Sequence, residues 1–316
     1  MHDDFPPGLV LVRDLAARGI DEQELRRAAN RGAAKRLRRG VYYNGDWEAL
    51  SPDAQYRLLC VGVARSRQKS SLMSHESAAS LWRIPTLSTS RSSTVHVTIS
   101  AATGGRSRNG IRRHVGKVPE ASRARIDDID VTTITRTIVD LAASASFRSA
   151  VIAADFAVHE GHAMVTLDEL WSEFELMKPF SNMRRAKRVL DFASTQSGSP
   201  GESLSRAVMH ELGFPAPVLQ ERFRGITGRV MYADFFWPEY SLVGEFDGRG
   251  KYEKQEYLNG MTPQERLWDE KKRQDDLNRH VRRVERWGWH EAMHPARLSA
   301  LLVDAGLPRR GVRPSG

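Results

Sequence analysis

Acidic side chains recur on two neighbouring apolar segments in the last third of the chain, where they could hold a divalent cation. Asp234 lies in the segment 229–236, and Glu245 and Asp247 lie in or directly beside the segment 241–247. A short turn containing a proline joins the segments, so we expect a β-hairpin. Carboxylates on otherwise apolar strands are costly unless they are paired or bound to metal. The chemistry that fits them is Mg²⁺ binding, because the bound ion would polarise a phosphate and activate water.

The register of this hairpin decides whether the carboxylates meet. If Phe236 pairs with Ser241, the three carboxylates share one face of the sheet, because side chains alternate along a strand. Asp234 and Glu245 are then diagonal neighbours, and their carboxylates can converge on one cation. We therefore predict Asp234 and Glu245 as metal ligands, with Asp247 beside them. A loop one residue shorter would reverse the alternation and separate these groups.

Two lysines could take part in the same chemistry. Lys251 follows Asp247 after a turn with glycines, and Lys271 lies on a strongly charged segment, 263–280, that we expect to be helical. Either lysine could orient the attacking water or neutralise the phosphate. The alternative is structural: the charged helix is an ordinary solvated face, and the carboxylates form ion pairs with Arg229, Arg249 or Lys251.

A second group of chemically active side chains is basic and lies near the N-terminus. Seven cations fall between residues 26 and 39 with no acidic residue among them: Arg26, Arg27, Arg31, Lys35, Arg36, Arg38 and Arg39. Cations at this density bind a phosphate backbone with an affinity that depends on salt and little on base sequence. We expect these seven residues to contact DNA. The alternative is a solvated basic face on a small structural domain.

The elements around the basic residues follow the order of a winged helix-turn-helix. Apolar residues of 9–16 recur at helical spacing, and Gly19 is placed to end that helix. Asp21 and Glu24 match the capping box of a second helix, which would enter the major groove. A short basic hairpin after it would form the wing and reach flanking phosphates. We therefore predict a winged helix-turn-helix DNA-binding domain over residues 1–50.

The rest of the chain predicts two further domains. Residues 51–193 alternate helical patterns with β-branched strands and form a mixed α/β middle domain. His75 and Glu76, on a predicted helix, are interpreted as structural because neighbouring residues on a helix point apart. Small and turn-forming residues after residue 193 predict a linker. A helix from Glu202, the hairpin, the charged helix and a strand then form an α/β/α domain over residues 199–316.

The composition favours a soluble protein with a polyanionic partner. The chain has 316 residues, with 48 lysines and arginines against 39 aspartates and glutamates, and its formal net charge is +9. One cysteine, Cys60, excludes a disulfide framework and a zinc site of the CxxC type. No apolar signal region follows Met1, and charged residues interrupt the most apolar stretch, 134–158. We expect a cytoplasmic protein that binds DNA and makes no membrane contact.

Two sequence runs near the N-terminus, Gly-Ile-Asp-Glu-Gln-Glu-Leu at 19–25 and Arg-Leu-Arg-Arg-Gly-Val-Tyr-Tyr at 36–43, carry a resemblance to a known family. This region resembles the N-terminal domain of AbiEi-type antitoxins from type IV toxin–antitoxin systems. The run Thr-Arg-Thr-Ile-Val-Asp-Leu-Ala at 135–142 extends the resemblance to about residue 160. The resemblance implies a winged helix that binds DNA and represses its own promoter. It also admits a cognate toxin as a protein partner.

Four separated motifs in the last third of the chain occur in a fixed order, at 199–206, 234–239, 245–248 and 270–277. Together they resemble the PD-(D/E)XK nuclease superfamily, and the branch similar to very-short-patch repair endonucleases is closest. The resemblance covers about residues 199–290 and implies a restriction-endonuclease-like α/β/α fold.

The nuclease resemblance also assigns roles to individual residues. It implies Asp234 and Glu245 as metal ligands, with Glu202 and Asp247 as supporting carboxylates. Asp247 stands where the superfamily usually has a lysine. Cleavage therefore requires Lys251 or Lys271 to replace that lysine, or a chemistry that needs none.

Two functions follow from these patterns. The first is an α/β multidomain DNA-binding protein whose C-terminal domain is a Mg²⁺-dependent endonuclease. The alternative is a non-enzymatic, antitoxin-like transcriptional repressor whose nuclease-like domain is inactive. The convergent carboxylates favour the first function, whereas the basic N-terminal region and the missing lysine favour the second.

Overall fold

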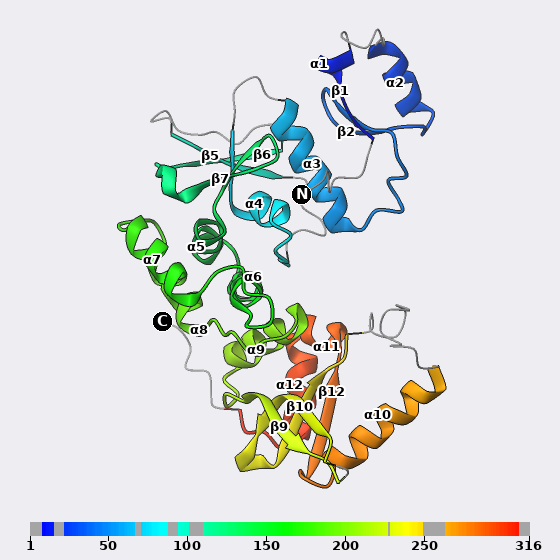
Figure 1. Cartoon of the computed structure of the whole chain (residues 1–316), viewed down its shortest axis with the longest axis vertical. Coiled ribbons are helices and arrows are strands. Elements are labelled where there is room, and N and C mark those ends of the chain that lie inside the picture. Colours follow the sequence, from blue (N-terminus) through cyan, green and yellow to red (C-terminus); the bar gives the residue numbers. More distant parts are fainter. Residues whose placement is uncertain are drawn as a thin grey trace. The chain divides into compact units, whose positions relative to one another are not determined.

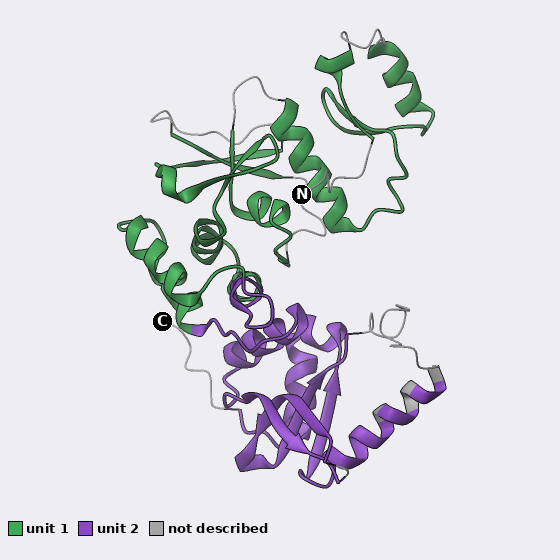
Figure 2. Cartoon of the chain, in the orientation of Figure 1, with its two compact units in different colours: residues 1–153, 164–191 green, residues 154–163, 192–316 purple. Residues whose placement is uncertain are grey.

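The computed structural model describes residues 8–15, 22–66, 71–87, 94–100, 110–226, 228–248 and 263–309. The chain divides into two compact units (Figure 2). Unit 1 contains residues 1–153 and 164–191, and unit 2 contains residues 154–163 and 192–316. In the described residues the strands form three sheets, so the chain is an α/β protein of several parts. None of the helices in these residues has the length and apolar character that spanning a bilayer requires.

The N-terminal part of unit 1 is a small sheet with two helices, shown in blue in Figure 1. Its elements are β1 (Leu9–Leu11), α1 (Val12–Leu15), α2 (Glu22–Asn30), β2 (Lys35–Arg38) and β3 (Val41–Tyr43). The antiparallel sheet has the order β1-β3-β2. Gly40 forms the turn of the β2–β3 hairpin with a φ of +77°, a conformation that glycine adopts without strain.

The first helix predicted from the sequence begins later than expected. Leu9 and Leu11 lie in strand β1, where they pair with Tyr43 and Val41, and the helix starts only at Val12. The helical spacing of these apolar residues was therefore misleading. Pairing with the buried strand β3 decides their conformation, because tertiary contacts outweigh the pattern of a short segment.

The larger part of unit 1 contains a mixed five-stranded sheet with the order β6-β5-β4-β8-β7. Its strands are β4 (Leu72–Met73), β5 (Val95–Ile99), β6 (Ile111–Val115), β7 (Arg123–Ile126) and β8 (Ile129–Thr132). Helices α3 (Pro52–Ser66) and α4 (His75–Leu81) pack on one face of it. Cys60, Met73, Val97 and Val131 belong to the apolar core between them. The chain continues through α5 (Ile134–Ser144), α6 (Phe147–Val158), α7 (Leu167–Met177) and α8 (Met183–Phe192).

The central strand of this sheet, β4, runs parallel to its neighbour β8, with Met73 beside Val131. Each is followed directly by a helix, α4 after β4 and α5 after β8. Thr133 caps α5, since its side chain accepts a hydrogen bond from the Arg136 amide. The starts of α4 and α5 therefore meet at the same edge of the sheet, and their polar side chains face each other there.

Unit 2 has a four-stranded sheet with the order β12-β11-β10-β9. The strands are β9 (Val218–Arg224), β10 (Val230–Trp237), β11 (Leu242–Phe246) and β12 (Arg283–Trp287). The helices of the unit are α9 (Pro200–Leu212), α10 (Pro263–Leu277), α11 (Trp289–Met293) and α12 (Pro295–Asp304). β11 and β12 are parallel, and the other neighbouring pairs are antiparallel.

Helix α9 begins and ends with standard signals and packs closely on the sheet. The Ser199 side chain accepts a hydrogen bond from the Glu202 amide, and Gly213 ends the helix in the left-handed conformation. Gly201 lies against Phe246, so closely that a β-carbon at position 201 would stand 2.0 Å from the ring. The apolar sheet face predicted from the sequence is buried, with Ala233, Phe235 and Leu242 at zero exposure.

The hairpin of β10 and β11 has a different register from the predicted one. Phe236 pairs with Val243 and not with Ser241, so the strands are shifted by two residues. The predicted pairing was wrong, but the shared face holds, because a shift of two residues preserves the alternation. Continuing the observed register by one residue places Asp234 directly opposite Glu245. The two carboxylates are thus cross-strand and not diagonal neighbours.

Candidate functional site

The seven cations predicted to bind DNA lie on α2, on the β2–β3 hairpin and on the turn between them. Six of them are exposed, and Arg38 is half-buried. Beneath them, the side chains of β3 are almost fully buried, with Val41 at 0 % and Tyr42 at 1 % exposure. The basic residues therefore stand on a packed support. This arrangement leaves most of their charge accessible to a large anionic partner.

The seven cations fall into two classes by their contacts. Arg26 forms an ion pair with Glu22 at 2.6 Å, and this partner raises the pKa of Arg26. Lys35 lies 4.0 Å from Glu48 and 5.9 Å from the centre of the Trp47 ring. Burial lowers the pKa of Arg38. The remaining four make no ion pair with another described residue, and we call them the open arginines: Arg27, Arg31, Arg36 and Arg39.

The predicted metal ligand Glu245 is buried in unit 2 and is bound by two arginines. Arg286 contributes an ion pair of 2.8 Å to Glu245 Oε2. Arg273 donates from both terminal nitrogens, with one contact at 3.1 Å and the other shorter. The structural alternative named Arg229 among the ion-pair partners, but Arg229 binds Asp269 at 2.6 Å. The carboxylate is paired as that alternative expected, although its partners are different arginines.

Two of the other three predicted carboxylates, Asp234 and Glu202, also have hydrogen-bond partners. Asp234 accepts a hydrogen bond of 2.8 Å from the Phe246 amide. Glu202 is buried and accepts hydrogen bonds from the Gly198 amide, the Ser199 hydroxyl and the Gln220 amide side chain. Asp247 is half-buried and lines a cavity of about 490 Å³. Asp234 and Glu245 therefore adjoin on one sheet face, whereas Glu202 belongs to the start of α9.

The two predicted lysines do not complete a site in the described residues. Lys271 is exposed on α10, with its ammonium 5.3 Å from the centre of the Trp268 ring. Lys251 lies outside the described residues. No group of three or more histidine, cysteine, aspartate or glutamate side chains within the described ranges is arranged to hold a metal ion. Mg²⁺ binding at Asp234 and Glu245 stays a prediction.

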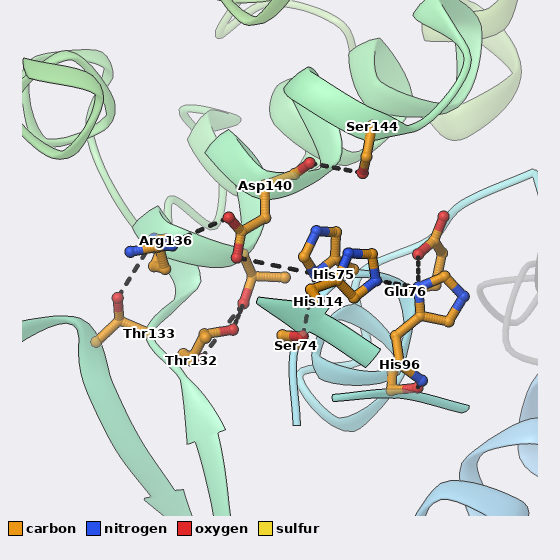
Figure 3. Close-up of polar contacts among 12 residues, drawn as sticks. Ser74, His75, Glu76, His96, His114, Thr132, Thr133, Arg136, Asp140 and Ser144 are labelled. Carbon is orange, nitrogen blue, oxygen red and sulfur yellow. Dashed lines mark hydrogen bonds and ion pairs between the residues drawn. The ribbon is translucent and has the colours of Figure 1, made fainter. Parts of the chain in front are cut away.

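A third group of chemically active residues lies in unit 1 and was not predicted. His75, His96 and His114 meet at the edge where α4 begins, and we call them the histidine cluster (Figure 3). The rings of His75 and His114 stack with centroids 3.5 Å apart and planes 13° from parallel. His96 Nδ1 lies 3.1 Å from His114 Nε2. His75 and His96 are buried, and His114 is half-buried.

Charged side chains surround the histidine cluster (Figure 3). Glu76 Oε2 lies 2.9 Å from His96 Nδ1, and Asp140 Oδ2 lies 4.0 Å from His75 Nδ1. The other oxygen of Asp140 accepts a hydrogen bond of 3.0 Å from Arg136. Arg136 also stands 3.9 Å from Glu173 of α7. The cluster therefore connects strands β5 and β6 with helices α4, α5 and α7.

Burial controls the protonation of this cluster. It lowers the pKa of His75 well below its usual value, and the neighbouring His114 and His96 lower it further. Burial and His96 also lower the pKa of His114, to about 4. Burial raises the pKa of Asp140 to about 6, against the opposing effect of Arg136. His75 has a φ of +52°, a left-handed conformation that is strained for a side chain of this size.

Sequence reasoning missed the histidine cluster because no local spacing reveals it. His75, His96 and His114 are separated by loops, and only the pairing of β5 with β6 brings the last two together. His75 and Glu76 were expected to point apart, yet both side chains reach the histidine cluster, since His75 stacks on His114 and Glu76 contacts His96. The pairing of the strands was the missing information.

Comparison with known proteins finds a family match for the N-terminal region. Residues 7–45 match the family described as "Transcriptional regulator, AbiEi antitoxin". The chain therefore carries an AbiEi antitoxin-type regulator domain at its N-terminus, as the sequence resemblance predicted. The match does not reach the last third of the chain, where the nuclease resemblance stays a prediction.

Two curated relatives and one solved structure show similarity to parts of the chain. Uncharacterized protein Rv2248 and Uncharacterized protein MT2308, from two strains of Mycobacterium tuberculosis, are each 37% identical over 62 residues, which is 20% of this chain. The chain spans 23% of the length of these relatives. The crystal structure of the RV2827C protein from Mycobacterium tuberculosis covers 69% of this chain and 84% of its own, at 19% identity and a TM-score of 0.38. This last similarity is too weak to support an argument.

Proposed function

We propose that the protein is a DNA-binding transcriptional regulator of the antitoxin type, and that β1 to β3 with α1 and α2 form its winged helix-turn-helix. The observation that carries this proposal is the set of open arginines, which stand exposed on α2 and the β2–β3 hairpin. They lie within the residues that match the AbiEi regulator family. A DNA duplex is a partner with the regular array of negative charge that these four cations require.

The proposed binding mode follows from the position of these arginines on the elements. Helix α2 enters the major groove, where Arg27 and Arg31 reach bases or phosphates. The β2–β3 hairpin is the wing, and Arg36 and Arg39 contact the flanking backbone. Arg26 contributes less, because its ion pair with Glu22 must weaken before it binds phosphate. In this mode α2 selects the site, whereas the wing mainly adds affinity.

The biological partners proposed are the protein's own upstream DNA and a cognate toxin. The AbiEi family match supports both, because antitoxins of this family act as transcriptional regulators. Repression of its own promoter requires only that α2 and the wing occupy the operator. The contact with a toxin is a separate property that DNA binding does not require.

Fluorescence anisotropy with labelled upstream DNA tests the proposal. We expect alanine at all four open arginines to weaken binding at least about 100-fold at moderate salt, because a phosphate that no arginine neutralises keeps its counterions. A matched control replaces Arg184 and Arg297, two exposed arginines on α8 and α12, with alanine. Equal weakening in both variants, or no binding by the unaltered protein, would exclude DNA recognition by α2 and the wing.

The second candidate is the Mg²⁺-dependent endonuclease implied by the resemblance of the last third of the chain. Its support is the register of β10 and β11, which, continued one residue beyond the observed pairs, would bring Asp234 opposite Glu245 on one sheet face. Arg273 and Arg286 would have to leave Glu245 before a cation could bind there. Plasmid DNA incubated with the protein and Mg²⁺ or Mn²⁺ tests this candidate. Nicking that disappears with Glu245→Ala would establish it, and intact plasmid would exclude it.

A further inference from the structure

The histidine cluster takes no part in the proposed DNA contact, yet its construction is unusual for a purely structural core. Three imidazole rings meet where α4 begins, those of His75 and His96 buried and that of His114 half-buried, and His75 has a positive φ there. Buried strain of this kind persists only where surrounding structure enforces it. Packing alone does not account for the cluster, because burying polar imidazoles costs more free energy than burying apolar side chains.

We propose that the histidine cluster is an acid-sensitive switch, whose protonation separates the stacked rings of His75 and His114 and loosens the start of α4. The geometry supports this directly. The stacked ring centroids are 3.5 Å apart, and His96 stands 3.1 Å from His114, so a second proton would place like charges in contact. At that separation and burial, repulsion between two imidazolium ions is strong, because little water screens it.

The surrounding charges neutralise such a protonated cluster only in part. Asp140 of α5 faces His75 but already binds Arg136 of the same helix. Three further charged groups act on the cluster from other elements. Glu76 of α4 contacts His96, and the charge of Arg112 of β6 acts on His75 and His114. Glu173 of α7 lies beside Arg136. The two arginines repel an added proton, whereas two carboxylate oxygens offset part of its charge. Glu76 Oε2 lies against His96, and Asp140 Oδ2 is buried without a hydrogen bond and faces His75.

The direction of the pH effect follows from the folded and unfolded states. Unfolded histidines bind protons near pH 6.5, whereas the pKa of His114 is about 4 in the folded protein and that of His75 is also lowered. The unfolded state therefore takes up more protons as the pH falls below about 6.5, and unit 1 loses stability. Asp140 opposes this loss of stability. Its pKa of about 6 means that the folded state binds a proton at Asp140 at a higher pH than the unfolded state does.

A chain of contacts joins the cluster to the DNA-binding region. The His96 amide donates a 2.8 Å hydrogen bond to Ser77 Oγ, which also lies 2.9 Å from the Tyr56 hydroxyl of α3. Further along α3, Gly62 packs against Val41 of β3, where a β-carbon would stand 2.4 Å from the valine. Loosening α4 therefore disturbs α3, the helix that supports the wing. This consequence for DNA binding rests on the proposed function, whereas the loss of stability does not.

Urea unfolding of the full chain between pH 7.5 and 5.0 tests the switch. We expect the midpoint of unit 1 to fall steadily with pH in the unaltered protein. His75→Asn and His114→Asn should each remove roughly half of the fall in the midpoint. Each substitution deletes one histidine that binds a proton in the unfolded state but not in the folded state. Asparagine is chosen at position 75 because it is among the residues with a side chain that best tolerate the left-handed backbone. Asp140→Asn should make the fall steeper, because the opposing proton uptake is lost.

The matched control is His162→Asn, which removes an exposed histidine of unit 2 and should leave the pH profile unchanged. If a cluster variant does not fold, hydrogen exchange of the unaltered protein gives the answer. We then expect residues 71–81 to lose protection at pH 5.5 while α9 keeps it. A flat profile, or equal slopes in the unaltered and histidine variants, would overturn the proposal.

DNA anisotropy at pH 7.5 and 5.5 separates this proposal from the proposed function. Binding at pH 7.5 that weakens at pH 5.5 only while the cluster is intact supports the link between them. Absence of binding at both pH values overturns the proposed function, and the urea profile still decides the switch.

Discussion

Arg273 binds Glu245 through both terminal nitrogens of its guanidinium and also donates a 3.0 Å hydrogen bond to the carbonyl of Tyr232. This one side chain of α10 thereby connects the helix to both β10 and β11. Arg286 of β12 reaches the same carboxylate from the other side. The two arginines account for a buried carboxylate on β11, whose other residues are apolar.

Removing Arg273 should destabilise unit 2 strongly. We expect Arg273→Ala to lower the free energy of unfolding by about 3 kcal/mol, because a buried carboxylate loses a two-pronged partner. Urea unfolding at pH 7.5 measures the change. Arg229→Ala is the control, since its pair with Asp269 is more exposed and should contribute less than about 1 kcal/mol. Equal effects of the two substitutions would contradict this account of Glu245.

A second buried ion pair joins residues 154–163 to the rest of unit 2. Arg206 contacts Asp155 at 2.5 Å, and the Ser194 amide donates to the other oxygen of that carboxylate. We expect Asp155→Ala to cost about 3 kcal/mol in urea unfolding, because it leaves the arginine charge without its partner. Asp191→Ala removes an exposed ion pair with Lys187 and serves as the control. A decrease below about 1 kcal/mol at Asp155 would show that the pair is not essential.

The packing of α9 on the sheet predicts that one added methyl group at position 201 destabilises the protein. Gly201→Ala should lower stability by about 1–3 kcal/mol, since the new β-carbon would overlap the Phe246 ring. Gly116→Ala offers the comparison, because a β-carbon there meets no atom within 4 Å. Thermal unfolding of the two variants should therefore diverge. The account is wrong if Gly201→Ala is as stable as Gly116→Ala.

The reactivity of the single cysteine reports on the core of unit 1. Burial raises the pKa of the Cys60 thiol to about 12, so the nucleophilic thiolate is scarce at pH 8. We expect iodoacetamide to modify the native protein at least about 100-fold more slowly than the protein in urea. Mass spectrometry of the alkylated fraction over time measures both rates. Similar rates in the two conditions would mean that the core around α3 is not closed.

The local sequence pattern was sufficient to predict the features of the fold that depend on the alternation of side chains along a strand and on charge. The apolar face of the β10–β11 hairpin follows from alternation alone, so it survived an error of two residues in the pairing of Phe236. The same holds for the exposed cations of 26–39, because charged side chains seldom enter a core. The helix predicted from Glu202 is present, but it begins two residues earlier, at Pro200, where Ser199 caps it.

Features that depend on distant segments could not be predicted. Leu9 and Leu11 form a strand because β3 lies beside them, and their spacing alone favoured a helix. The arginines bound to Glu245 come from α10 and β12, whose positions no local signal fixes. The histidine cluster likewise requires the pairing of β5 with β6 before its rings meet.

The salt dependence of DNA binding by the open arginines tests the central claim most directly. Anisotropy titrations of the unaltered protein against its upstream DNA at several salt concentrations should give a linear fall of log K with log salt. Replacing Arg27, Arg31, Arg36 and Arg39 with alanine should reduce that slope by about 0.9 for each phosphate that the variant no longer neutralises. A slope that stays the same in this variant, while Arg184→Ala with Arg297→Ala reduces it, would contradict DNA recognition by α2 and the wing.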